Sequence, residues 1–152
     1  MDLELSGEYL IDASRKEVWE CLNDPEILKQ CIPGCETLEQ NKPDTFTAKV
    51  VLKIGPVKAS FDGEVELTDK VFPESYLISG KGSGGVAGMA SGSAAANLVD
   101  EGGKTRLIYK ADAAISGKIA QLGSRLIKST SAKLASKFFS AFCELVSERE
   151  IA

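Results

Sequence analysis

A series of segments in which apolar and polar residues alternate, followed by one long amphipathic helix, most constrains the fold of this 152-residue chain. Period-two alternation is typical of β-strands that bury one face. Consecutive strands joined by short turns pair antiparallel. The pattern therefore predicts an antiparallel sheet that buries one face on a single helix. The clearest alternating set is Phe46, Ala48, Val50, Leu52 and Ile54.

Gly, Pro and Asn/Asp turn signals divide the chain into seven predicted strands and two short helices. Ser14 and Glu17 form a capping box that starts the first helix, and Pro25 suits the first position of the second helix, which ends at Pro33-Gly34. Both helices fall after the first strand. The predicted strands are 3–11, 35–40, 45–54, 57–71, 75–80, 86–99 and 105–115.

The last segment is predicted to be a helix from about Ala120 to Glu148, which Gly123-Ser124 could kink. Leu122 and Leu126 lie beside its main apolar stripe. That stripe, at three- and four-residue spacing, is Ile127, Leu134, Phe138, Phe142 and Leu145.

The predicted order gives an α+β fold of the helix-grip type. A curved, mostly antiparallel seven-stranded sheet wraps on the long C-terminal helix, and two short helices follow the first strand. The length, with 43% apolar and 26% charged residues, suits a single domain over residues 1–152.

The later strands place unusually small side chains opposite the aromatic residues of the last helix. Gly88, Ala90, Gly92, Ala94 and Ala96 share one face, and Ala111 and Ala113 continue it. Two explanations stay open: the helix lies close to a bent sheet, or an apolar pocket remains. Tyr76 and Tyr109 would be polar groups in such a pocket. The predicted lining is Tyr76, Ile78, Ala90, Ala94, Leu107, Tyr109, Ala111, Leu134, Phe138 and Phe142.

The absence of histidine excludes several catalytic and metal-binding arrangements, including Ser-His-Asp triads and HExxH zinc sites. We expect no catalytic residue, no cofactor and no metal. Cys31 and Cys35 would need two more thiolates to hold zinc, so the four cysteines are interpreted as free thiols. The acidic N-terminus lacks a signal-peptide pattern, which favours a cytoplasmic protein.

Charge and glycine patterns add little to the functional assignment. The isoelectric point near 5.0 argues against nucleic-acid binding, although Lys104–Lys137 is basic and could meet anionic lipid or an acidic partner.

Gly80–Gly85 fits G-x-G-x-x-G but precedes a strand-like segment, so it is interpreted as a hairpin connection. The run 82–99 is too poor in Leu, Ile and Phe for a membrane span. The alternating Asp62, Glu64 and Glu66 are expected to face solvent.

Several short segments resemble the CoxG family of carbon monoxide dehydrogenase subunits, within the START/Bet v 1-like (SRPBCC) superfamily. The resemblance runs from about Leu5 to about Phe142. Its most specific parts are Cys31-Ile32-Pro33-Gly34-Cys35 and the segment from Gly117 to Arg125. The other parts are Asn23-Asp24-Pro25, Gly55-Pro56-Val57-Lys58-Ala59 with Gly63, and Gly84-Gly85-Val86-Ala87-Gly88 with Gly92.

The resemblance implies a helix-grip fold with an apolar cavity and a non-catalytic role beside a carbon monoxide dehydrogenase-type molybdenum hydroxylase. The expected ligand is lipid-like or a quinone, and the expected partners are that enzyme and the inner face of the membrane. The basic stretch, or exposed Leu122 and Leu126, would make the membrane contact. Two alternatives remain: a helix-grip enzyme of the cyclase or dehydratase type, and a protein-binding adaptor with a filled core.

Overall fold

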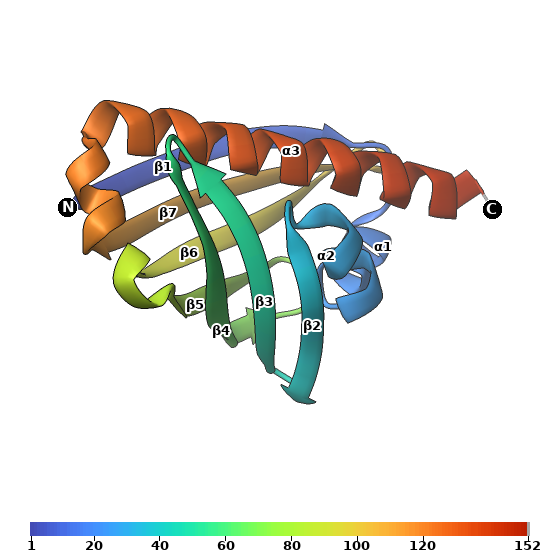
Figure 1. Ribbon diagram of the computed structural model, residues 1–152. Helices are drawn as coiled ribbons and strands as arrows, with labels where there is room; N and C mark the ends of the chain where they lie inside the picture. The colour runs from blue at the N-terminus through green and yellow to red at the C-terminus, as the bar shows by residue number, and fades with distance from the viewer. Residues whose placement is uncertain (152) are drawn as a thin grey trace.

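The computed structural model describes residues 1–151, and the side chains of residues 1–148. It contains a seven-stranded sheet, two short helices and one long helix (Figure 1). The elements are β1 Asp2–Ile11, α1 Arg15–Leu22, α2 Pro25–Cys31, β2 Cys35–Lys42, β3 Thr45–Ile54, β4 Val57–Val71, β5 Ser75–Ser83, η1 Gly85–Ala87, β6 Met89–Glu101, β7 Lys104–Ser116, η2 Lys118–Leu122 and α3 Ser124–Ile151.

The sheet has the strand order β1-β7-β6-β5-β4-β3-β2, and every neighbouring pair is antiparallel. The strands from β2 to β7 follow one another, whereas β1 pairs with the last strand, from Asp2 opposite Ala114 to Ile11 opposite Thr105. Figure 1 shows the strongly twisted sheet with α3 along it, and α1 and α2 at the end where α3 finishes. The predicted helix-grip architecture is confirmed.

Local signals in the sequence start the two short helices as predicted. The Ser14 hydroxyl oxygen accepts a hydrogen bond from the Glu17 backbone N–H at 3.3 Å, and an Asp24 carboxylate oxygen accepts one from the Glu26 N–H at 3.0 Å. These caps satisfy N–H groups that the first helical turn leaves without partners. The fully buried Thr105 hydroxyl donates to the Ala13 carbonyl at 2.7 Å, which fixes the chain before α1 to β7.

Three predicted boundaries are wrong, and glycines explain two of them. Residues 85–87 form the 3-10 turn η1, so β6 begins at Met89; Gly85 has φ +62° and Gly88 has φ +125°. The predicted C-terminal helix is interrupted at Gly123, whose φ is +96°, and η2 precedes a helix that starts at Ser124. Residues other than glycine rarely adopt such backbone φ values. These values interrupt a regular strand or helix. Finally, β5 extends to Ser83, so residues 80–83 of the predicted 80–85 connection are strand.

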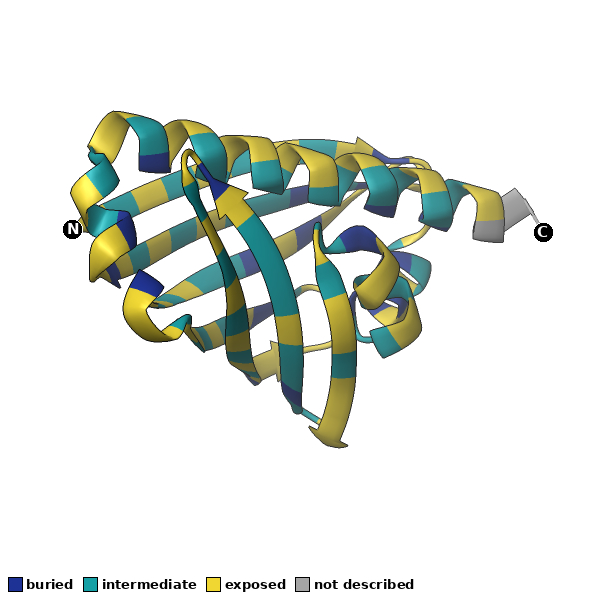
Figure 2. Cartoon of the chain, in the orientation of Figure 1, coloured by how far each residue is buried: buried dark blue, intermediate teal, exposed yellow. Residues whose placement is uncertain are grey.

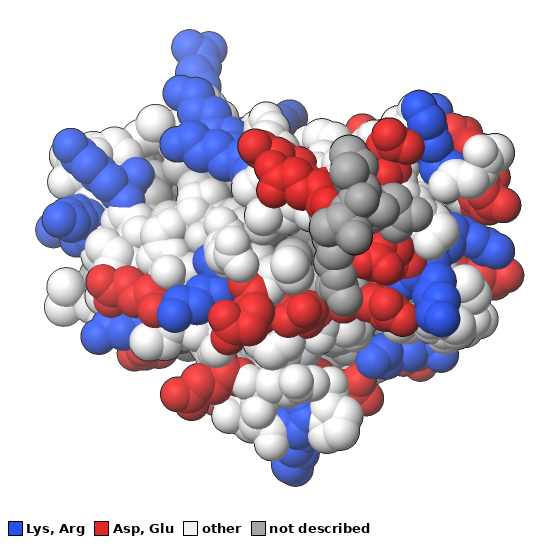
Figure 3. Space-filling model, turned by 90° about the vertical axis from the view of Figure 1, so that its right-hand side faces the viewer, with Lys and Arg blue, Asp and Glu red and all other residues white. Residues whose placement is uncertain are grey.

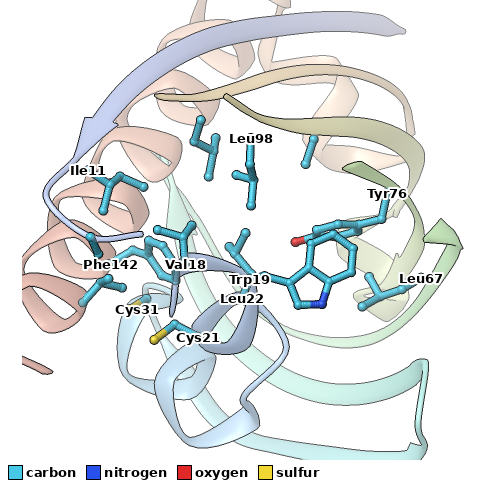
Figure 4. Close-up of a cluster of buried hydrophobic side chains, with 14 of the residues drawn as sticks. Ile11, Val18, Trp19, Cys21, Leu22, Cys31, Leu67, Tyr76, Leu98 and Phe142 are labelled. Carbon is cyan, nitrogen blue, oxygen red and sulfur yellow. The ribbon is translucent and has the colours of Figure 1, made fainter. Parts of the chain in front are cut away.

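The buried core divides into two clusters at opposite ends of α3 (Figure 2). The larger cluster joins α1, α2 and the last turns of α3, and includes Ile11, Trp19, Tyr76 and Phe142 (Figure 4). The smaller cluster joins the β3–β4 hairpin, η1, η2 and the first turns of α3. Its buried residues are Ile54, Ala87, Ile115, Ile119 and Ile127.

We expect Gly92→Ala to destabilise the protein, because a Cβ atom on Gly92 would lie 2.3 Å from the Asp112 carbonyl oxygen on the neighbouring strand. Overpacking of this kind costs about 1–3 kcal/mol. Gly82→Ala is the matched control: it lies on the same sheet face, and its nearest atom would be 3.9 Å away. Urea denaturation should show a lower free energy of unfolding for Gly92→Ala and little change for Gly82→Ala. Equal values for the two variants would contradict this packing.

Candidate functional site

An apolar cavity of about 270 Å³ lies between the sheet and the helices α1, α2 and α3. Apolar side chains from β2 to β7 make its wall, and Leu28 and Ile32 close it from the α2 side. The sheet reaches around the cavity because its twist carries β2 and β3 across to α2 (Figure 1). The lining is Leu22, Leu28, Ile32, Leu38, Phe46, Val65, Leu67, Tyr76, Ile78, Ala94, Ala95, Ala96, Leu107, Tyr109, Phe138 and Phe139.

Tyr76 and Tyr109 contribute the only side-chain polar groups of this lining. Tyr76 is 4% exposed, and its ring meets the Trp19 ring edge-on at 5.1 Å. Its hydroxyl points into the interior (Figure 4) and has no hydrogen-bond partner among the described residues. Burial raises the pKa of Tyr76, so the hydroxyl stays neutral. A hydroxyl in this position can donate a hydrogen bond to a ligand oxygen.

A stack of aromatic rings forms the α3 side of the cavity. The Phe139 ring lies 4.4 Å from the Tyr9 ring and 5.2 Å from the Tyr109 ring, with both pairs nearly parallel. Gly7 leaves space for Tyr109, since a Cβ atom there would lie 2.8 Å from the Tyr109 ring. Phe138 crosses Phe139 at 90° and lines the cavity. Large rings at this end hold α3 away from the small residues of β6.

The structure brings six of the ten predicted site residues to the cavity: Tyr76, Ile78, Ala94, Leu107, Tyr109 and Phe138.

The other four predicted residues lie nearby. Phe142 is fully buried in the larger cluster and stacks on Phe138 at 5.9 Å. Ala90 packs against the smaller cluster. Ala111 and Leu134 are half-buried on the inner faces of β7 and α3.

A half-buried band separates the two core clusters. Leu5, Val50, Ala111 and Leu134 face inward, yet none is buried and none belongs to either cluster. Ala111 lies opposite Leu5 on β1 and opposite Ala94 on β6. Because Ala94 lines the cavity, the band leads from the cavity along α3. We call these four residues the inner band.

Sequence reasoning missed the contributions of α1, α2, β2, β3 and β4 to the cavity. The inward face of Phe46 and the apolar residues Leu22 and Leu28 were recognisable as core positions, but nothing local places them opposite Tyr109. Curvature of the whole sheet brings them together. Phe46 lies opposite Val65 across β3–β4, and Val65 lies opposite Gly80 across β4–β5. This row of residues therefore crosses the curved part of the sheet.

A second hollow, of about 980 Å³, is more open to solvent and is lined by residues of all seven strands. Exposed charged residues lie along it, including Glu4, Glu64, Lys81 and Asp112. It is therefore a poorer site for an apolar molecule than the smaller cavity, because an open hollow leaves more ligand surface in water.

The cysteines offer little chemistry at the site. None of the four forms a disulfide, and no lining position is a cysteine. Burial raises the pKa of Cys31 to about 11, so this thiol stays protonated at neutral pH. The described residues hold no group of three or more side chains placed to bind a metal.

Comparison with known proteins gives a family and a fold. Residues 7–147 match the family described as the CoxG subunit of carbon monoxide dehydrogenase. No curated protein sequence matches. A conserved protein from Geobacillus kaustophilus has a similar structure, with TM-score 0.90, 31% identity and 96% of each chain covered.

Two enzymes share the fold at low sequence identity. The Zhui aromatase/cyclase from Streptomyces sp. R1128 has TM-score 0.72 and 11% identity, covering 98% of this chain and 96% of its own. Norcoclaurine synthase from Thalictrum flavum has TM-score 0.65 and 15% identity, also covering 98% and 96%. The family match over most of the chain, together with the helix-grip architecture, shows that this protein belongs to the CoxG family of carbon monoxide dehydrogenase subunits.

Proposed function

We propose that this protein binds an apolar molecule with a polar head, lipid-like or a quinone, in the cavity between the sheet and the three helices. The observation that carries the proposal is the Tyr76 hydroxyl inside a lining whose other side chains, apart from Tyr109, are entirely apolar. Burial of apolar ligand surface would supply most of the affinity, and the hydroxyl would fix the orientation.

The size of the cavity supports a ring-sized head group. An apolar cavity of about 150 Å³ holds benzene. The cavity here, of about 270 Å³, has room for a substituted ring but not for a long chain. A long apolar tail would therefore leave the cavity and follow the inner band, where half-buried Leu5, Ala111 and Leu134 offer apolar contacts.

The lining also supports binding without catalysis. Among the described residues, no carboxyl or amine side chain lines the cavity, and the chain contains no histidine. General acid–base chemistry would fall on Tyr76 or Tyr109, and burial raises the pKa of both hydroxyls away from neutrality. The two enzymes of similar fold share it at too low an identity to transfer their activity.

Family membership supports an accessory role, and we propose that the partner is a carbon monoxide dehydrogenase-type molybdenum hydroxylase. The protein would act in the cytoplasm as a carrier that serves this enzyme and helps it to meet the inner face of the membrane. None of the helices in the described part of the chain combines the length and the apolar composition needed to cross a bilayer.

Trp19 offers a built-in reporter, because it is the only tryptophan and its ring lies 5.1 Å from that of Tyr76. A benzoquinone bearing a medium-length alkyl chain should quench Trp19 fluorescence in a saturable titration. Ala94→Leu should weaken binding at least about tenfold, because a larger side chain fills the cavity and excludes the ring. Ala111→Leu should weaken it less, since Ala111 would contact only the tail.

The matched control for this titration is Ala132→Leu, which makes the same change on an exposed position of α3. It should leave the affinity unchanged, and circular dichroism should show all three variants folded. If Ala94→Leu binds the quinone as tightly as Ala132→Leu does, the ligand lies outside this cavity and the proposed site is wrong.

Tyr76→Phe tests the proposed polar contact. The change should lower the affinity for the alkyl benzoquinone about three- to tenfold, as expected for one hydrogen bond. It should leave the affinity for an alkylbenzene of similar size unchanged, since that probe has no oxygen. Thermal unfolding should show no loss of stability, because the hydroxyl has no partner among the described residues of the free protein. Equal changes in affinity for both probes would show that Tyr76 contributes to binding only through the shape of its side chain, and not through a hydrogen bond.

A further inference from the structure

One end of the molecule presents apolar side chains to solvent on a well-held loop. Val86, in η1, is 92% exposed, and Met89, the first residue of β6, is 53% exposed. Ala87 between them is buried in the smaller cluster, together with Ile119 of η2. The close approach of Gly88 and Gly117 fixes η1 against η2, since a Cβ atom on Gly117 would lie 2.5 Å from the Gly88 Cα. The two exposed side chains are therefore fixed outward by the fold.

The predicted membrane contact through exposed Leu122 and Leu126 is not what the structure shows. Leu122 is half-buried against the smaller cluster. Leu126 is half-buried beside the β3–β4 hairpin, where its Cδ2 lies 2.8 Å from the position of a Cβ on Gly55. These two leucines close the end of the core, whereas Val86 and Met89 are exposed to solvent.

Exposed cations gather at the same end. Lys118 lies in η2, Arg125 and Lys128 lie in the first turns of α3, and Lys53 and Lys58 flank the β3–β4 hairpin that contacts α3. None of these five forms an ion pair with a carboxylate of the described residues. We call these five cations, with Val86 and Met89, the basic end.

The segments that carry the five cations contain no Asp or Glu. Residues 53–58, 118–122 and 124–128 hold only basic charges, although the whole chain carries a net charge of −4. Acidic residues lie further along the strands that lead from this end, with Asp2 opposite Ala114 and Asp62 opposite Ser83.

The charge order along α3 opposes the helix dipole. Arg125 and Lys128 lie near its N-terminus, where negative groups are favourable, and its first turn has no acidic residue. Glu144 and Glu148 lie toward its C-terminus, where cations are favourable. Figure 3 shows the end of the molecule where α3 finishes, with many acidic side chains around it. Helix stability therefore does not explain this segregation of charge.

We propose that the basic end docks on an anionic phospholipid bilayer, with Val86 and Met89 inserted among the head groups and the five cations facing the lipid phosphates. Exposed apolar side chains at the same end as several lysine and arginine residues suit such a surface, and the end where α3 finishes would then face away from it. The inference deepens the proposed function and rests on it, because a carrier of a lipid-like ligand has to meet the membrane that supplies it.

The test measures binding to vesicles of about three parts phosphatidylglycerol to seven parts phosphatidylcholine, by flotation at low salt. The wild-type protein should float with these vesicles. It should not float with vesicles of pure phosphatidylcholine, or with the mixed vesicles in about 500 mM salt. The triple variant Lys118→Gln, Arg125→Gln, Lys128→Gln should bind at least about tenfold more weakly, as expected from a loss of about fivefold or less per cation. The double variant Val86→Ser, Met89→Ser should bind several-fold more weakly.

A charge-matched control is Lys16→Gln, Lys29→Gln, Lys104→Gln, which changes three exposed cations on α1, α2 and the β6–β7 turn. It should bind the vesicles within about twofold of wild type. Equal losses in the two triple variants, or no binding by the wild type, would overturn the proposed docking surface.

Trp19 quenching by the alkyl benzoquinone, measured without vesicles, separates the two proposals. Retained quenching with failed flotation rejects the docking surface alone, and the reverse result rejects the ligand cavity alone.

Discussion

The packing of α3 on the sheet at two separate places is the constraint on which the rest of the structure depends. Phe142 and the ring stack of Phe139 on Tyr9 hold one end of the helix, and Ile127 with Ile119 and Ile54 holds the other. The half-buried inner band lies between these clusters, and the apolar cavity lies at the end of α3 that carries Phe138 and Phe139. Protein interiors are normally filled to high density. The small side chains Ala94, Ala95 and Ala96 of β6 leave space between that end of α3 and the sheet.

Much of the fold could be predicted because its signals are local. The alternation of Phe46 to Ile54 or of Leu107 to Ala113 fixes which face of each strand is buried, and the capping residues Ser14 and Asp24 fix where the short helices begin. The failures are also local. Gly88 and Gly123 sit in stretches whose composition suits a strand and a helix, and only their positive φ angles show where each element is interrupted.

The site was predicted less completely because its geometry is not local. Side chains on β5, β6, β7 and α3 could be assigned to one interior, since the strand faces and the helix stripe identify them. Leu38 and Phe46 join Tyr109 around the same cavity only because the sheet curls, and no short-range pattern encodes the amount of curl. Ala111 and Leu134 belong to the predicted lining, yet they lie in the inner band beside the cavity. Family resemblance supplied the ligand class, which geometry alone leaves as any apolar molecule with one polar group.

The central claim is that the protein carries an apolar guest beneath α3. Mass spectrometry of small molecules extracted from the freshly purified protein tests it most directly. We expect a quinone or a lipid in near-stoichiometric amount, because an apolar cavity with the Tyr76 hydroxyl inside it favours such a molecule over water. Protein that is reproducibly empty, and that also fails to take up added apolar probes, would contradict the account.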